Sequence, residues 1–171
     1  MKTLILSSSL SESSKSFILF KYADRRLKEI GVEAELVDAR ELELLPYYKG
    51  PTKDMIALAE KVDNADNLII GMGVHNFSIN ASLKIILEGC FNGAEGKFFG
   101  ILCASGGNKS YLSTQHLTQI CMNEWRMMQL PRIVYATHVD FDDDKILNEE
   151  LIKRLNEFCL EFKKIGEKLL D

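Results

Sequence analysis

Residues that could bind a ligand gather in three short segments of the chain, and each segment directly follows an apolar run. The segments are residues 7–16, 74–78 and 104–108, and the runs before them are residues 3–6, 67–73 and 98–103. If the runs are neighbouring parallel strands, the loops at their carboxyl ends lie along one edge of a sheet and form a crevice there. We therefore expect one binding site assembled from all three segments.

The first segment is rich in hydroxyl groups and leads into a helical pattern. The N-terminus of a helix carries unpaired N–H groups and a partial positive charge, which attract phosphate. Ser9, Ser14 and Ser16 are spaced so that a loop folded over the helix start directs several hydroxyls at one phosphate, and Ser11 lies between them. Neither the Walker A pattern nor the G-x-G-x-x-G pattern is present. The alternative is a serine-rich turn with a simple N-cap.

The second segment combines an imidazole, an amide, a phenyl ring and a hydroxyl, in the order Val74, His75, Asn76, Phe77 and Ser78. A flavin ring needs an apolar wall and a few polar groups at its edge. Phe77 suits the wall, and Asn76 with the backbone N–H groups suits the polar edge. His75 is either exposed to solvent or a flavin contact that tunes the charge around the ring.

Two glycines distinguish the third segment, Ser105-Gly106-Gly107. Because they have no Cβ atom, they let the backbone approach a ligand closely. Ser105 or Asn108 then bonds the pyrimidine edge of a flavin. Taken alone, the segment fits a flexible strand-to-helix turn equally well. Together, the three segments predict a site for flavin mononucleotide (FMN).

Strand and helix patterns alternate along the whole chain. We predict strands at residues 3–7, 34–37, 67–71, 98–104 and 132–137, and helices at residues 14–30, 80–91 and 110–128, with two more that begin after Thr52 and after Asn148. Near-continuous apolar strands indicate a parallel sheet covered on both faces. The predicted fold is a three-layer α/β/α flavodoxin-like domain spanning residues 1–171. Its five parallel strands have the order 2-1-3-4-5, with a crevice between strands 1 and 3.

Composition limits the classes of partner. The chain has 171 residues, 46% apolar content and a net charge of −4, which fits one domain with a full core. Nucleic acid or an anionic membrane surface would require a basic patch, so neither is expected as the main partner. No run approaches the ~20 apolar residues of a membrane span. The short apolar stretch after Lys2 does not resemble a secretory signal, so we expect a cytoplasmic protein.

Other polar groups are expected to be structural. The four cysteines, Cys90, Cys103, Cys121 and Cys159, form no C-x-x-C pair and sit in apolar patterns, which predicts buried thiols and no metal site. The acidic run at residues 140–144 is expected to be a solvated loop. His116, on a predicted helix, and His138, just past the last strand, receive no role.

The three segments, in this order, resemble the NADPH-dependent FMN reductase family, which includes azo-dye, quinone and chromate reductases. Ser8 to Ser14 occupy the position of a G-S-x-R-x-x-S phosphate motif. The stretch from Gly73 to Lys84 is similar to P-x-Y-N-x-S-x-P-x-x-L-K and keeps Asn76, Ser78, Leu83 and Lys84 at the same spacing. Ser105-Gly106-Gly107 corresponds to the S-G-G that follows a strand. The resemblance covers nearly the whole chain.

The chain departs from the family pattern at five positions. Ser8 replaces the leading glycine of the phosphate motif and Ser11 replaces its arginine. Gly73 and Asn80 replace the two prolines of the second motif, and His75 replaces its tyrosine. Loss of a bidentate arginine contact weakens phosphate binding unless another cation, such as Lys15, compensates.

The resemblance implies an FMN-dependent oxidoreductase that takes hydride from NADPH or NADH and passes electrons to a small acceptor. The flavin performs the chemistry, so we predict no catalytic side chain. The family is usually dimeric or tetrameric, which predicts a homo-oligomer. Two alternatives stay open: a flavodoxin-like electron carrier, and a family member that has lost FMN and serves as a binding or regulatory protein.

Overall fold

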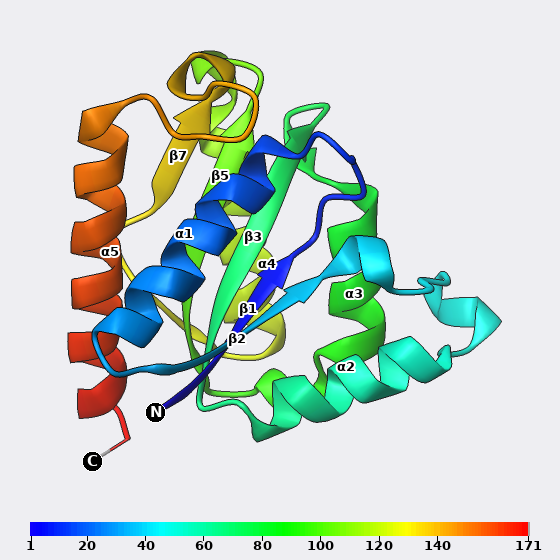
Figure 1. The fold of residues 1–171 in the computed structure, drawn as a ribbon. Coiled ribbons are helices and arrows are strands. Elements are labelled where there is room, and N and C mark those ends of the chain that lie inside the picture. Colours follow the sequence, from blue (N-terminus) through cyan, green and yellow to red (C-terminus); the bar gives the residue numbers. More distant parts are fainter. Residues whose placement is uncertain (171) are drawn as a thin grey trace.

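A parallel sheet runs through the centre of the computed structural model, which describes residues 1–170 (Figure 1). Its path is β2-β1-β3-β5-β6, and β7 also pairs with β5. The strands are β1 (Lys2–Ser7), β2 (Glu33–Asp38), β3 (Asn67–His75), β5 (Phe98–Ser105), β6 (Met128–Gln129) and β7 (Val134–Thr137), and a short β4 (Ser78–Ile79) pairs antiparallel with β3. If β6 and β7 count as one interrupted strand, the parallel order is the predicted 2-1-3-4-5.

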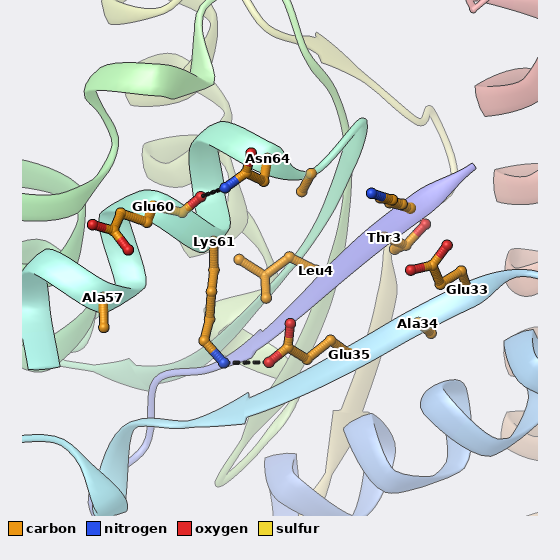
Figure 2. A pocket seen from close by; sticks show the side chains of 11 residues that line it. Thr3, Leu4, Glu33, Ala34, Glu35, Ala57, Glu60, Lys61 and Asn64 are labelled. Atoms are coloured by element: carbon orange, nitrogen blue, oxygen red, sulfur yellow. Dashed lines mark hydrogen bonds and ion pairs between the residues drawn. The ribbon is translucent and has the colours of Figure 1, made fainter.

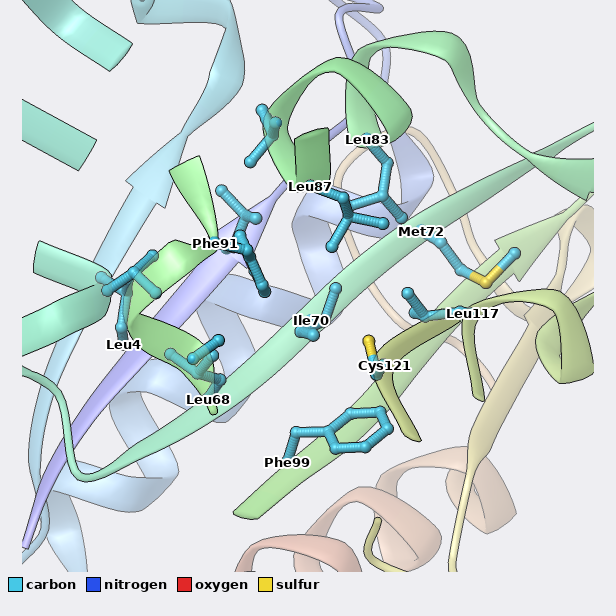
Figure 3. Packing of buried hydrophobic residues seen from close by; sticks show 14 of the residues in the cluster. Leu4, Leu68, Ile70, Met72, Leu83, Leu87, Phe91, Phe99, Leu117 and Cys121 are labelled. Atoms are coloured by element: carbon cyan, nitrogen blue, oxygen red, sulfur yellow. The ribbon is translucent and has the colours of Figure 1, made fainter. Parts of the chain in front are cut away.

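Helices cover both faces of this sheet. The α-helices are α1 (Lys15–Glu29), α2 (Lys53–Asn64), α3 (Ala81–Cys90), α4 (Thr114–Glu124) and α5 (Glu149–Lys168). Helices α1 and α5 pack on one face, where Phe20, Phe158 and Phe162 are buried together. Helices α2, α3 and α4 pack on the other face around Phe91, Phe99 and neighbouring aliphatic side chains (Figure 3). The three-layer flavodoxin-like prediction is confirmed.

Side-chain caps begin three of the helices where the sequence predicts. Ser14 caps α1 by accepting the Phe17 N–H, and Thr52 caps α2 by accepting the Met55 N–H. Asn148 caps α5 by accepting from the N–H groups of Glu150 and Leu151. Such caps each stabilise a helix by ~1 kcal/mol because they satisfy N–H groups that the helix itself leaves unpaired.

Two predicted elements have different bounds. The helix predicted at residues 110–128 is a 3₁₀ turn, Asn108–Ser113, followed by α4, and Met128 belongs to β6. The strand predicted at residues 132–137 begins only at Val134, as β7. A separate two-residue strand, β6, pairs with β5 before it, and residues 130–133 separate the two. Pro131 lies in the gap and has no N–H to donate to a ladder, which accounts for the interruption.

The acidic run at residues 140–144 is only partly a solvated loop. Asp140 accepts hydrogen bonds from the Thr137 N–H, the Thr137 hydroxyl and Asn148, and Phe141 is buried. Burial opposes ionisation of Asp140, but these hydrogen bonds outweigh it and lower the pKa of the carboxyl group. Asp142, Asp143 and Asp144 are exposed, as predicted.

Within residues 1–170, no helix is both long enough and apolar enough to cross a membrane. All four cysteines are free and buried. Burial raises the pKa of Cys90 to about 11 and the pKa values of Cys103, Cys121 and Cys159 to about 12.

We expect these thiols to be inert in the native protein. Because their pKa values are raised, the reactive thiolate is scarce at pH 8, and burial also blocks access. A chromogenic disulfide reagent should detect no fast-reacting thiol in the native state and all four after denaturation. A thiol that reacts within seconds in the native protein would contradict the packing described here.

Candidate functional site

The three ligand-binding segments meet at the carboxyl edge of the sheet. Ser7, at the end of β1, pairs with Gly71 of β3, and Gly73 pairs with Ala104 of β5. Because β1, β3 and β5 are adjacent, the loops that leave them are neighbours in space although about sixty residues separate the first two in sequence. Figure 1 shows these loops together at the upper end of the sheet.

The first segment, which we call the phosphate loop (residues 8–14), wraps the N-terminus of α1. The hydroxyl oxygen of Ser14 lies 3.3 Å from the Phe17 nitrogen and 2.9 Å from the hydroxyl oxygen of Ser16. Ser16 is buried, and Ser14 is half-buried. Two hydroxyls therefore lie beside the positive end of the helix dipole, where an anion is favoured.

Ser9 and Ser11 lie further out on the phosphate loop. The Ser9 hydroxyl accepts a hydrogen bond from the Ser11 N–H at 3.3 Å, and Ser11 is exposed. The Arg40 guanidinium donates to the Glu12 carbonyl at 3.2 Å and lies over the Phe17 ring, which anchors the loop from the end of β2. Hydrogen bonds with Asp38 raise the pKa of Arg40, so its charge is already paired.

Lys15 makes contacts that the sequence does not predict. Its Nζ atom donates to the carbonyl oxygens of Asp142 and Asp143 at 2.9 and 2.8 Å. These bonds tie the start of α1 to the loop that precedes α5. Lys15 therefore lies at the phosphate loop with its ammonium group engaged elsewhere.

The second segment is a β-hairpin rather than the predicted loop. Strand β3 continues to His75, and Val74 and His75 pair with Ile79 and Ser78 of β4. Asn76 and Phe77 form the turn with φ values of 50° and 59°. Two successive left-handed residues are typical of a type I′ turn, whose twist matches that of the flanking strands. The strand extends this far because the antiparallel return supplies its backbone with partners.

Phe77 is the most unusual residue of this hairpin. Its side chain is 64% exposed at the tip, and a bulky residue rarely adopts positive φ. Such strained and exposed residues are concentrated at ligand-binding sites. Ser78, beside it, lies 2.9 Å from the His116 Nδ1 atom, so helix α4 supports the hairpin.

The third segment is held by two side chains on or after β7. The Tyr135 hydroxyl donates to the Gly107 carbonyl at 2.6 Å, and the His138 Nδ1 atom lies 2.6 Å from the Gly106 carbonyl oxygen. The Gly107 N–H lies 3.4 Å from the Ser105 hydroxyl oxygen. The loop is thus held in one conformation. His116 and His138, which received no role from the sequence, both contact the site segments.

Sequence reasoning also misses Asn80, the residue that joins the first two segments. Asn80 and Ser8 are 2% and 0% exposed. The Asn80 amide nitrogen donates to the Ser8 carbonyl at 2.9 Å, and its Oδ1 atom accepts from the Ser8 hydroxyl at 3.0 Å and from the Gly73 N–H at 3.3 Å. Its place in the family motif was the available signal, because an amide stands there instead of proline.

Glycines at the carboxyl edge leave room that the protein does not fill. A Cβ atom added to Gly73, Gly106 or Gly107 would meet no other atom within 4 Å, and none of the three has positive φ. A Cβ atom on Gly71 would instead lie 1.9 Å from Cζ of Phe20. Packing explains Gly71, whereas the other three leave open backbone where a flat ligand can lie.

One hollow at the other end of the sheet has less suitable chemistry for a phosphate-bearing ligand. Figure 2 shows this hollow, of about 460 Å³, at the opposite end of β1 and β2, beside α2. Its walls carry Glu33, Glu35 and Glu60, and Lys61 is paired with Glu35. Carboxylates repel phosphate, so the serine-rich edge is the better site. Among residues 1–170, no cluster of three or more acidic, histidine or cysteine side chains could hold a metal ion.

This fold, with loops arranged for a ligand at the carboxyl edge, defines a flavodoxin-like α/β protein. Comparison with known families matches residues 1–142 to NADPH-dependent FMN reductase. The chain belongs to this family, and it is an NAD(P)H-dependent reductase that uses FMN. The donor set fits the cofactor, since hydroxyls and a helix N-terminus suit its phosphate and open glycine backbone suits its ring.

Solved structures share the fold at low sequence identity. The flavoenzyme NAD(P)H:(acceptor) oxidoreductase FerB from Paracoccus denitrificans has a TM-score of 0.79 and 18% identity, over 98% of this chain and 97% of that one. The NADH:FMN oxidoreductase EMOB has a TM-score of 0.77 and 18% identity, over 93% and 88%. A flavodoxin from the domain Archaea has a TM-score of 0.65 and 12% identity, over 95% and 99%. A comparison with curated protein sequences found no match.

A pair of glycine substitutions tests the open backbone. Gly71→Ala should lower the free energy of unfolding by about 1–3 kcal/mol, because the new methyl group overlaps the Phe20 ring. Gly106→Ala should leave the unfolding free energy of the ligand-free protein unchanged within about 0.5 kcal/mol. Urea denaturation of both variants decides the matter, and equal destabilisation would show that Gly106 is required by the fold.

Proposed function

We propose that this reductase takes hydride from NADPH or NADH and delivers electrons to a small acceptor such as a quinone, a flavin, an azo compound or a metal ion. The observation that carries the proposal is the convergence of three loops, from the adjacent strands β1, β3 and β5, on one edge of the sheet. Bound there, FMN supplies the hydride and electron transfer. The protein supplies the positions and charges around it.

In this proposal the phosphate loop holds the cofactor phosphate. Ser14 and Ser16 lie at the start of α1, and Ser9 and Ser11 lie on the loop above it. The hydroxyls donate to phosphate oxygens, and the helix N-terminus adds N–H groups and a favourable dipole. Hydroxyls with no formal charge replace the arginine that the family motif has at Ser11.

The hairpin and the third segment face the rest of the cofactor. Val74, His75, Asn76, Phe77 and Ser78 contact the ribityl chain and the ring, and Phe77 covers part of the ring face. Ser105, Gly106 and Gly107 meet the pyrimidine end, where the open backbone permits close approach. No side chain among these is assigned to proton transfer, in keeping with a site in which the protein orients the cofactor.

We also propose that the protein is a cytoplasmic single-domain reductase that forms a homodimer or homotetramer. Leu10 on the phosphate loop, Phe77 on the hairpin and Leu112 after the third segment are 57%, 64% and 73% exposed. Exposed apolar side chains grouped around a ligand site favour contact with a second subunit that completes the pocket. A purely monomeric species by light scattering would count against this assembly.

One observation favours an electron carrier as the second candidate. The fold also matches an archaeal flavodoxin, and the exposed edge leaves room for a protein partner. The modest charge of −4 provides little electrostatic steering toward such a partner, which favours the enzyme. Loss of FMN binding altogether would favour a binding or regulatory role.

The visible absorption spectrum of the purified protein tests the function. We expect a yellow protein, or one that becomes yellow with added FMN, and bleaching when NADPH or NADH is added without oxygen. Bleaching by one nucleotide identifies the donor. A yellow protein that neither nucleotide bleaches supports the carrier, and a protein that never binds FMN contradicts both proposals.

Restoring the family arginine should tighten cofactor binding. Ser11→Arg places a guanidinium on the phosphate loop, and hydrogen bonds to a charged group contribute about 1.5–3 kcal/mol, which corresponds to an about 10- to 100-fold lower Kd for FMN. Flavin fluorescence titration of the apoprotein measures the change. Ser13→Arg is the matched control, because it adds the same charge two residues away. Equal tightening by both variants would indicate general electrostatic attraction instead of a phosphate contact.

A further inference from the structure

Three departures from the family pattern meet in one buried cluster. Ser8 stands where the phosphate motif has glycine, and Gly73 and Asn80 stand where the second motif has prolines. Asn80 bonds to both of the others. We propose that Asn80 is a positioning residue of the FMN site, which fixes the phosphate loop to the flavin hairpin through Ser8 and Gly73. This inference rests on the proposal that FMN lies between these two segments.

Each departure supplies a group that the family residue lacks. Glycine at position 8 would have no hydroxyl to place between Asn80 Oδ1 and the Gly71 carbonyl. Proline at position 73 would have no N–H to donate to Asn80 Oδ1, and proline at position 80 would have no amide at all. The three residues therefore support one another, because Asn80 Oδ1 meets both the Ser8 hydroxyl and the Gly73 N–H.

Both polar atoms of the Asn80 side chain have hydrogen-bond partners within the cluster. Its amide nitrogen donates to the Ser8 carbonyl at 2.9 Å and to the Ser82 hydroxyl oxygen at 2.6 Å, and its Oδ1 atom accepts from Ser8 and Gly73. Ser82 in turn donates to the Ser8 carbonyl at 2.5 Å. The single hydrogen of the Ser8 hydroxyl is shared between the Gly71 carbonyl oxygen, at 2.6 Å, and Asn80 Oδ1, at 3.0 Å. Buried and satisfied networks of this kind hold one conformation, because any alternative breaks several bonds in a medium without water.

The position of the cluster connects it to the cofactor. Ser8 is the first residue of the phosphate loop, Gly73 begins the part of β3 that becomes the hairpin, and Asn80 immediately follows β4. The cluster thus lies beneath both segments and sets the spacing between the proposed phosphate site and the proposed ring site. The prolines of the family motif could not donate a backbone N–H or an amide group to these hydrogen bonds.

Substitutions can remove the cluster without forcing the backbone. Asn80 has a φ of −70°, which proline adopts, and the preceding Ile79 is in a strand, as a residue before proline prefers. Asn80→Pro and Ser8→Gly each restore one family residue. Each should raise the Kd for FMN about tenfold, because each leaves buried partners unsatisfied.

The double variant S8G/N80P provides the decisive comparison. Two residues that act through one shared contact are not additive. We expect the double variant to bind FMN about as weakly as either single variant, instead of the about hundredfold weakening that independent sites would give. Flavin fluorescence titration of the apoproteins supplies the Kd values.

Hydrogen exchange of the apoprotein provides a readout that needs no FMN. Asn80→Ala should accelerate amide exchange in residues 9–14 and in the hairpin at least tenfold. Asn67→Ala is the matched control, because Asn67 is also a buried asparagine, 1% exposed, at the other end of β3. Asn67→Ala should lower the thermal stability of the protein. It should neither accelerate amide exchange in the phosphate loop nor raise the Kd for FMN.

The outcomes separate this inference from the proposed function. Suppose that the wild-type protein binds no FMN but Asn80→Ala still accelerates exchange in the phosphate loop. The cluster then positions the loop, but the proposed function is wrong, and the claim that Asn80 positions an FMN site is overturned with it. If FMN binds and Asn80→Ala changes neither loop exchange nor Kd, or if the S8G and N80P effects simply add, Asn80 is not a positioning residue. Equal effects from Asn67→Ala would also overturn it.

Discussion

The parallel pairing of β1, β3 and β5 is the constraint on which the rest of the molecule depends. Its register places Ser7 beside Gly71 and Gly73 beside Ala104, so three loops that are distant in sequence leave the sheet at the same edge. The pairing is stabilised because helices bury both faces of the strands. Helices α1 and α5 cover one face, and α2, α3 and α4 cover the other. A slip of one residue in this register would exchange the two faces of a strand and separate the loops.

The loops at this edge are held mainly by hydrogen bonds from outside themselves. Arg40, just after β2, holds the phosphate loop, and His116 supports the hairpin from α4. Tyr135 on β7 and His138 just after it hold the third segment. Each support comes from an element next to the loop that it holds. The edge is therefore ordered before any ligand arrives, which reduces the entropy that binding must overcome.

The sequence predicts the strand order, the helix caps at Thr52 and Asn148, and the convergence of the three segments, because these follow from local patterns and from the rules of parallel sheets. It does not predict the hairpin, since two left-handed residues at Asn76 and Phe77 are a local conformation that few patterns indicate. The sequence also does not predict the roles of Asn80 and His116. Their partners, Ser8 and Ser78, lie 72 and 38 residues away, and such contacts emerge only when the elements are packed.

The hydrogen bonds from Tyr135 and His138 to the third segment have a consequence for the electron affinity of a flavin bound there. Tyr135 and His138 engage the carbonyl oxygens of Gly107 and Gly106, and all peptide bonds in residues 1–170 are trans, so the N–H groups of Asn108 and Gly107 point away from these carbonyls. The loop thus turns the positive ends of two peptide dipoles away from β7. Of these two N–H groups, that of Gly107 is directed at the Ser105 hydroxyl. A flavin ring bound against the Asn108 N–H would lie in a positive local field, which would favour its reduced, anionic form over its oxidised form.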